Sequence, residues 1–554
     1  MSETGRPLPL VTPWNEFYWT SGADGRLRLQ SCESCAGLIH PPKPVCPYCG
    51  SSATAVTAVS GFATLFGFTV SHRFQLPGLP SPTIVAQVAI EEDPRVKLTT
   101  RLVGCAEADL QLGERMEVTF EHVEDVWLPL FRRADSQPER PAPLPPDEVP
   151  AEQVRTFVRT AGPLRKFEDD VVLSGVGASA IGRRLMADPL SLTIDACRAA
   201  VADAGLEMSD IDGLCTYPSG AMESGFSEGG VTALEAALRL RPTWFNGGAE
   251  TPGPGGSLIG AMLAVSAGLV RHVLCFRTIW QSSHDQLMRQ GVLRPGSGRV
   301  SGDMGWGMPF GATSAAHVLA QSAQRHFHAY GTTRETLGWI ALNQRANAAL
   351  NPTAVYREPL TMDDYLSARM ITTPFGLYDC DVPCDAAVAV IVSAVETAGD
   401  LRTRPVRVEA VGTQIIERME WDQSTSTHEP QVLGPAAHLW SRTNLRPDDV
   451  DVAELYDGFT FNCLSWIEAL GFCRLGEAKD FLDGGNNIAR DGVLPLNTHG
   501  GQLSHGRTHG MGLVHEAVVQ LRGEGGPRQV QDARVAVVSS GGLTPSGVLL
   551  LRTE

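Results

Sequence analysis

Hydrophobic and polar positions change their spacing along the chain. Between about residues 56 and 131, short runs alternate apolar and polar residues, and glycine, proline and acidic residues separate the runs. Residues 63–70 and 84–90 are examples. Alternation with a period of two predicts β-strands. Several short strands with turn residues between them predict a small β-barrel.

From residue 171 onward the pattern predicts strands that alternate with helices, which favours a layered α/β domain. One order of segments occurs twice. An apolar helix-like run, a polar turn and a strand cover residues 192–217 and again residues 433–456. A glycine-rich loop, a helix and a strand are repeated in the same way at 253–276 and 506–538. The repetition predicts two similar halves packed about a pseudo-two-fold axis, with equivalent loops meeting at one pocket.

Four cysteines precede the predicted barrel as two Cys-x-x-Cys pairs. Cys32 pairs with Cys35 and Cys46 with Cys49, and ten residues lie between the pairs. Two such turns place four thiolates at the corners of a tetrahedron, which is the arrangement of a closed structural zinc site. Zinc binding contributes ~10–16 kcal/mol to the folding of segments too small to have a core of their own. We therefore predict a zinc ribbon.

The length of 554 residues exceeds what one hydrophobic core supports, so we predict several domains. An N-terminal helix and the zinc ribbon occupy 1–55, the barrel 56–133, a proline-rich linker 134–170, and the α/β domain 171–554, with halves at about 171–403 and 404–554.

The net charge of −17 argues against a nucleic-acid partner, because an acidic chain is not attracted to phosphates. The N-terminus lacks the apolar stretch of a secretion signal, and the longest apolar helical run is too short to span a bilayer. We therefore expect a cytoplasmic protein whose twelve cysteines are metal ligands or reduced thiols.

The loop at residues 496–512 holds three histidines, one arginine and five glycines. A glycine-rich turn before a helix exposes backbone N–H groups, which suit an oxyanion or a phosphate. We interpret this loop as half of an active site, with the loop at 250–257 as its pseudo-symmetric partner.

The first 135 residues or so resemble acyl-CoA-associated proteins that combine a rubredoxin-like zinc ribbon with an OB fold and accompany thiolase-like enzymes. The matching features are a predicted helix at 14–19, the two cysteine pairs and the segment 126–131. The resemblance implies a partner domain that handles acyl-CoA, here fused downstream.

The remainder resembles the thiolase superfamily, in particular its sterol-carrier and lipid-transfer branch. The resemblance rests on residues 172–177, 379–387, 454–460, 506–512 and 540–543. It implies the thiolase fold, a CoA thioester as substrate and a homodimer formed through this domain.

Three catalytic loops depart from the thiolase pattern. Thiolases carry the acyl group on a cysteine in the first glycine-rich loop, but residues 250–257 contain no cysteine and Gly253 stands at that position. Arg507 takes the place of the histidine in the Gly-His-Pro element, and Ser539 or Ser540 replaces the late cysteine. Retro-aldol cleavage of a β-hydroxyacyl thioester needs a base and oxyanion donors but no thiol.

The same branch contains aldolases that cleave the side chains of steroid CoA thioesters, with tyrosines in place of the thiolase residues. Tyr456 matches one such position. Ionising a phenol at neutral pH costs about 4 kcal/mol, which Arg507 or a histidine would partly offset. Alternatively His505 or His509 is the base and Tyr456 a donor. The predicted catalytic residues are thus Tyr456, His505, Arg507 and His509. The predicted substrate and CoA contacts are Gly255, Gly256, Ser257, His499, Gly506, Gly541 and Gly542.

We therefore predict an acyl-CoA carbon–carbon lyase, with the OB domain helping to bind CoA. A thiolase-like acyltransferase, including one that acylates carbon, and a catalytically silent acyl-CoA or lipid carrier are the alternatives. The loop at 296–311 has two interpretations, a lid over an apolar pocket and a dimer contact. Cys380 and Cys384 are interpreted as buried thiols.

Overall fold

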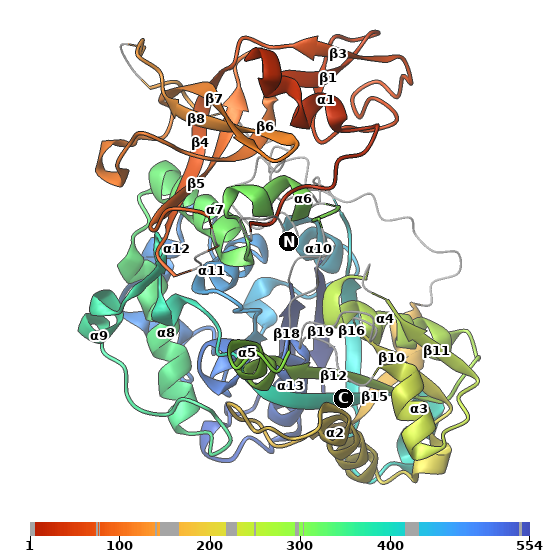
Figure 1. Cartoon of the computed structure of the whole chain (residues 1–554). Helices are drawn as coiled ribbons and strands as arrows, with labels where there is room; N and C mark the ends of the chain where they lie inside the picture. The colour runs from red at the N-terminus through yellow and green to blue at the C-terminus, as the bar shows by residue number, and fades with distance from the viewer. Residues whose placement is uncertain are drawn as a thin grey trace.

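The computed structural model describes residues 6–73, 76, 78–138, 141–144, 166–217, 230–248, 251–293, 299–302, 304–415, 432–541 and 546–553. Figure 1 shows a β-rich N-terminal part standing on a larger α/β part. None of the helices in the described ranges combines the length and the apolar character of a bilayer span. Most of the predicted linker, residues 139–140 and 145–165, lies outside the described residues.

The N-terminal part contains a short helix, a three-stranded ribbon and a barrel. The helix is α1 (Glu16–Trp19), and the ribbon has the order β2 (Leu38–Ile39), β1 (Arg28–Cys32), β3 (Thr54–Ala58). The barrel strands are β4 (Phe62–Ser71), β5 (Thr83–Ile90), β6 (Asp93–Arg101), β7 (Arg115–Val123) and β8 (Val126–Arg133). The two alternating runs quoted above form β4 and β5, which confirms the predicted strands, although most of their residues are buried on both faces. A bridge between Leu102 and Phe131 joins the end of β6 to β8.

A hairpin from the α/β part extends the barrel sheet. It consists of β13 (Met370–Thr372) and β14 (Phe375–Gly376), and Thr372 of β13 pairs with Ser71 of β4. The hydroxyls of Thr69 and Thr372 lie 2.5 Å apart. Two segments distant in sequence thus share one sheet.

The α/β part is built on a nine-stranded sheet of order β11-β10-β12-β15-β9-β16-β19-β18-β17. The strands are β9 (Val171–Ala178), β10 (Gly213–Thr216), β11 (Trp244–Gly247), β12 (His272–Trp280), β15 (Asp385–Ala394), β16 (Val406–Gly412), β17 (Val452–Glu454), β18 (Val535–Ser540) and β19 (Gly547–Arg552).

The strand order confirms the predicted duplication. In the first half, β9 pairs antiparallel with β15, β15 antiparallel with β12, and β12 parallel with β10. In the second half, β16 pairs antiparallel with β19, β19 antiparallel with β18, and β18 parallel with β17. The two series meet where β9 pairs with β16. A parallel bridge from Ala453 to Leu496 stands where β11 pairs with β10 in the first half.

The helices α4 (Gly253–Ser266) and α13 (Met511–Arg522) are the equivalent helices of the two halves. Leu258 and Met262 of α4 share one buried cluster with Leu513 and Val518 of α13. Both helices carry apolar residues on most of their faces, because neighbouring elements bury each helix on several sides. The remaining helices are α2 (Pro189–Ala204), α3 (Val231–Leu238), α5 (Gln281–Arg289), α6 (Met304–Gly307), α7 (Ala315–Tyr330), α8 (Arg334–Ala349), α9 (Met362–Ser367), α10 (Leu433–Trp440), α11 (Thr460–Ala469) and α12 (Ala478–Leu482).

The described part of the loop at 296–311 contacts the N-terminal part. The Trp306 ring stacks on Trp19 at a centroid distance of 5.0 Å, and the Arg6 guanidinium donates to the Pro309 carbonyl at 2.8 Å. Figure 1 shows α6 and α7 directly beneath the barrel. The described part of the loop therefore forms an interface between the two parts of one chain, and its roles as a lid or a dimer contact stay predictions.

Candidate active site and zinc site

The four cysteines of the ribbon fit a tetrahedral zinc ion. Their sulfur atoms all lie within 4.8 Å of one another. The Cys32 and Cys49 sulfurs are 3.5 Å apart, and those of Cys35 and Cys46 are 3.7 Å apart. Four ligands at about 2.3 Å from a zinc ion are separated by about 3.8 Å. Among the described residues this is the only cluster with metal-ligand geometry.

Tyr456 follows β17 and is held by its backbone. Its N–H donates to the Ser539 hydroxyl at 2.8 Å, and the preceding Leu455 exchanges two hydrogen bonds with the Asn497 side chain. The Tyr456 side chain is buried, and its ring lies against the backbone of Gly458. The end of one strand, the neighbouring strand and the glycine-histidine loop thus fix one phenol.

Arg277 on β12 binds His509, and its charge interacts with the Tyr456 phenol. The guanidinium donates to His509 Nδ1 at 2.7 Å and to the Tyr217 carbonyl at 2.6 Å. Burial, followed by the charges of Arg507 and Arg277, holds the pKa of His509 well below its ordinary value. His509 is therefore neutral. Because a guanidinium only donates, Nδ1 accepts and the ring proton is on Nε2.

Arg507 is paired with a carboxylate. Its Nε lies 3.0 Å from Asp381, and its Nη1 donates to Gln281 at 3.2 Å. Burial raises the pKa of Asp381 to about 6, against the opposing charge of Arg507. Arg507 therefore contributes a cation that is largely neutralised above that pH.

His499 and His505 lie in a different environment from His509. His499 Nδ1 is 3.2 Å from Glu454, while His505 Nε2 is 3.2 Å from the Thr353 hydroxyl. Burial opposes the charge on His499, but the hydrogen bond and charge of Glu454 outweigh it and raise the pKa. Burial and the neighbouring His499 hold the pKa of His505 far below its usual range. The structure thus groups Tyr456 with Arg507 and His509, and His505 with His499.

The first glycine-rich loop is tied to the late serine. Gly255 N–H donates to the Ser540 hydroxyl at 3.1 Å. Gly256 N–H donates to the Pro252 carbonyl, and the Ser257 hydroxyl to the Pro254 carbonyl. These groups are hydrogen-bonded within the protein, and their contact with substrate stays a prediction.

The other residues predicted to contact substrate are only partly described. Gly506, with a φ of 147°, adopts a backbone conformation that favours glycine and packs against Cys384. Gly541 is buried, while Gly542 lies outside the described residues. Cys384 donates to the Arg507 carbonyl at 3.3 Å, and burial raises the pKa of its thiol. The thiol next to this site is thus held in its protonated form.

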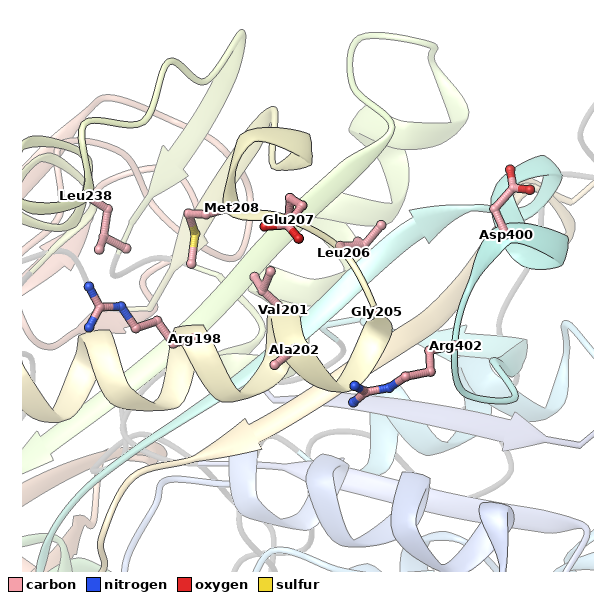
Figure 2. A pocket seen from close by; sticks show the side chains of 10 residues that line it. All are labelled: Arg198, Val201, Ala202, Gly205, Leu206, Glu207, Met208, Leu238, Asp400 and Arg402. Atoms are coloured by element: carbon pink, nitrogen blue, oxygen red, sulfur yellow. The ribbon is translucent and has the colours of Figure 1, made fainter.

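A surface hollow of about 760 Å³ lies elsewhere on the molecule. Figure 2 shows Arg198 and Arg402 at its two sides, with Glu207 and Asp400 above. It shares no residue with the site around Tyr456, and its exposed side chains carry charges of both signs.

Sequence reasoning missed Arg277 and gave Asp381 no role. Arg277 interrupts the apolar strand His272–Trp280, and an arginine in a buried strand is costly unless it has a partner. That interruption is the signal that marks it. No comparable feature of the sequence indicates that Asp381 pairs with Arg507.

Family models match three parts of the chain. They describe a ChsH2 rubredoxin-like zinc ribbon domain at residues 19–55, a ChsH2 C-terminal OB-fold domain at 56–121 and a thiolase C-terminal domain-like region at 419–551. Fold and site together define a thiolase-fold protein that carries a zinc ribbon and an OB-fold barrel.

Two curated proteins and one solved structure are similar over most of their length. The chain is 34% identical to a steroid side-chain-cleaving aldolase of Thermomonospora curvata, across 68% of this chain and 97% of that protein. It is 34% identical, with the same two coverages, to the 17-hydroxy-3-oxo-4-pregnene-20-carboxyl-CoA lyase of Mycobacterium tuberculosis. An Ltp2–ChsH2(DUF35) aldolase structure matches with a TM-score of 0.61 and 32% identity, across 69% of this chain and 98% of that chain. The chain belongs to the thiolase-like family of these side-chain-cleaving aldolases and lyases.

Proposed function

We propose that this protein is a carbon–carbon lyase that cleaves a β-hydroxyacyl-CoA by a retro-aldol reaction. One observation carries the proposal. Gly253 stands at the position of the thiolase nucleophile, while the buried phenol of Tyr456 interacts with the charge of Arg277, which in turn binds His509 and interacts with Arg507. Such a site has no thiol at the nucleophile position and combines a phenol with cationic and hydrogen-bond donors. The activities in the names of both relatives support the same chemistry.

In the proposed reaction the Tyr456 phenolate removes the proton of the β-hydroxyl group. The bond between Cα and Cβ breaks, a carbonyl forms at Cβ, and the electron pair passes to the thioester as an enolate. The His509 Nε2–H is the proposed donor to the enolate oxygen. The Tyr456 phenol then returns the proton to Cα, which regenerates the phenolate and releases a shortened acyl-CoA together with a ketone or aldehyde. No covalent enzyme intermediate forms.

We propose a bulky acyl group on the substrate, of the steroid side-chain type named for the two relatives. The resemblance to the aldolases implies a second tyrosine at position 507, where this chain has Arg507. The group that completes the acid–base pair with Tyr456 therefore differs from a tyrosine in this protein. The OB-fold barrel is proposed to help bind the CoA portion. The zinc ion is structural, because four thiolates leave no open position for a substrate.

The direct test incubates the full-length protein with 17-hydroxy-3-oxo-4-pregnene-20-carboxyl-CoA and simpler β-hydroxyacyl-CoA thioesters. We expect a ketone or aldehyde and a shortened acyl-CoA, detected by mass spectrometry. Thiolytic cleavage of a β-ketoacyl-CoA in a parallel incubation with free CoA would indicate an acyltransferase instead. Tight binding without turnover across the panel would indicate a carrier.

Tyr456→Phe tests the residue assignment. Loss of the proposed base should lower kcat by ~10²–10⁴-fold. Tyr356→Phe is the matched control, because that phenol is partly exposed and contacts Arg183 at the surface. A parental rate in Tyr456→Phe would refute the role of Tyr456 while leaving the lyase activity intact.

We further propose a homodimer formed through the α/β part. The support is β11, which ends the nine-stranded sheet and leaves one edge unpaired in the described chain. Phe245 on this strand is 63% exposed, and Leu263 and Leu269 nearby in the fold are 50% and 59% exposed. An unpaired edge flanked by apolar side chains suits pairing with a second copy. A cytoplasmic location is proposed from the twelve cysteines, none of which forms a disulfide.

Sedimentation velocity of Phe245→Glu tests this interface. We expect the parental protein to sediment as a dimer and Phe245→Glu as a monomer, because the substitution places charge in the apolar contact. Val493→Glu is the control, since Val493 is equally exposed, at 71%, on another element. A monomeric parental protein would overturn the proposal.

A further inference from the structure

Arg277 is a buried cation without a carboxylate partner in the described part of the chain. Arg277 is 1% exposed. Among the described residues, its Nε has no hydrogen-bond partner and its guanidinium forms no ion pair. Its guanidinium donates only to the neutral Tyr217 carbonyl and to His509. Uncompensated buried charge is costly, so such a group is retained where a reaction uses it.

The charged and titratable groups that face Arg277 come from three other segments. They are Tyr217 after β10, Tyr456 after β17, and Arg507 with His509 in the glycine-histidine loop. Asp381, before β15, faces Arg507, and Asp457 influences Asp381. Burial lowers the pKa of Arg277 to about 9, although Tyr217 and Tyr456 oppose this effect. Arg277 therefore remains protonated at neutral pH.

We propose that Arg277 is the positioning residue that supplies the positive charge needed for the Tyr456 phenol to act as a base. In addition, its bond to His509 holds the imidazole proton on Nε2. The inference rests on the proposed lyase activity and adds a residue that does not itself touch the substrate.

The ionisation of the Tyr456 phenol depends on which nearby cation lacks a compensating negative charge. A free phenol titrates near 10, so only about one molecule in a thousand is ionised at pH 7. A neighbouring opposite charge lowers such a pKa by roughly one to three units. Arg507 is largely neutralised by Asp381, so Arg277 is the cation whose charge is balanced when Tyr456 ionises.

The hydrogen bond to His509 decides between the two candidate bases. Nδ1 accepts from Arg277, and Nε2 carries the proton, so neither nitrogen is ready to take a proton from the substrate. His509 is then a donor toward the enolate oxygen. Tyr456 is the group that removes the hydroxyl proton.

The pH dependence of kcat/KM in Arg277→Gln tests the proposal. We expect the ascending limb to move upward by about one to three pH units, so that the rate falls about 10- to 1000-fold at neutral pH and recovers at high pH. Arg277→Lys keeps the charge and should restore the limb in part. A uniform loss at every pH would show a merely structural role and overturn the proposal.

A second readout does not require turnover. The ultraviolet absorbance of phenolate, taken as the difference between the parental protein and Tyr456→Phe, isolates Tyr456 among the eight tyrosines. We expect Tyr456 to ionise below the ordinary value near 10 in the parental protein and nearer 10 in Arg277→Gln. Titration of the parental Tyr456 at or above 10 overturns the inference, even if Arg277→Gln fails to fold.

The two readouts separate the failure of this inference from that of the lyase proposal. A Tyr456 titration that is depressed in the parental protein and moves toward 10 in Arg277→Gln, without cleavage of any thioester, would support the electrostatic effect of Arg277 and refute the proposed function. Arg325→Gln is the matched control, because Arg325 is equally buried but lies on α7, where it contacts Gln87 of the barrel. Arg325→Gln should change neither the ascending limb of the kcat/KM profile nor the pH at which Tyr456 ionises.

Discussion

At the scale of single residues, Gly458 determines whether the Tyr456 ring fits. A Cβ atom at Gly458 would lie 2.7 Å from Tyr456 Cε1 and 3.0 Å from its hydroxyl oxygen. The Gly458 backbone does not need glycine, since its φ is outside the positive region. A side chain here would therefore act on the phenol and leave the local fold intact.

We predict that Gly458→Ala lowers kcat/KM by about a hundredfold, because a displacement of about 1 Å at a reacting group has an effect of that size. Steady-state kinetics measure the loss, and thermal unfolding checks the fold. Gly399→Ala is a suitable control, since no atom lies within 4 Å of a Cβ at that position. A parental rate in Gly458→Ala would show that the phenol position is unimportant.

At the scale of elements, α6, α7 and the β13–β14 hairpin join the two parts of the chain. The hairpin extends the barrel sheet, and α7 places His317 3.0 Å from the Ser71 hydroxyl. Trp306 adds an aromatic stack on Trp19. The barrel is thus attached to the α/β part by shared strands and side chains and is not merely tethered by a linker.

Trp306→Ala should weaken this attachment by at least the ~0.5–1.5 kcal/mol of an aromatic pair. The measurement is gel filtration after a protease site placed in residues 145–165 has been cut. The two fragments of the parental protein should elute together. At the same low protein concentration, the two fragments of Trp306→Ala should elute separately. Trp14→Ala is the control, because Trp14 is 78% exposed. Equal dissociation of all three proteins would argue against the stack.

At the scale of the whole molecule, the zinc ribbon supports the N-terminal part. We predict one zinc ion per chain by elemental analysis and its loss in Cys46→Ser. Because zinc contributes ~10–16 kcal/mol of apparent folding energy, chelation should unfold the ribbon. Cys105→Ser should retain zinc, since Cys105 lies in the barrel region away from the cluster. Full zinc content in Cys46→Ser would refute the assignment.

Local patterns determined much of the fold. Alternation with a period of two predicted β4 and β5, because it depends on residues close together in sequence. The spacing of four cysteines predicted their cluster for the same reason. The order of segments, repeated along the chain, predicted the duplicated sheet. The residue bounds of the domains remain a prediction.

Only the tertiary structure decided which residues share a site. His505 and His509 are four residues apart, yet one contacts Thr353 and the other Arg277, because Gly506 between them turns the chain. Arg277 joins the site from a strand more than two hundred residues earlier, since strand order and not sequence distance sets its neighbours. Residue types and spacing marked the chemistry of this protein, whereas the partners of each charge depended on the packing of the two halves.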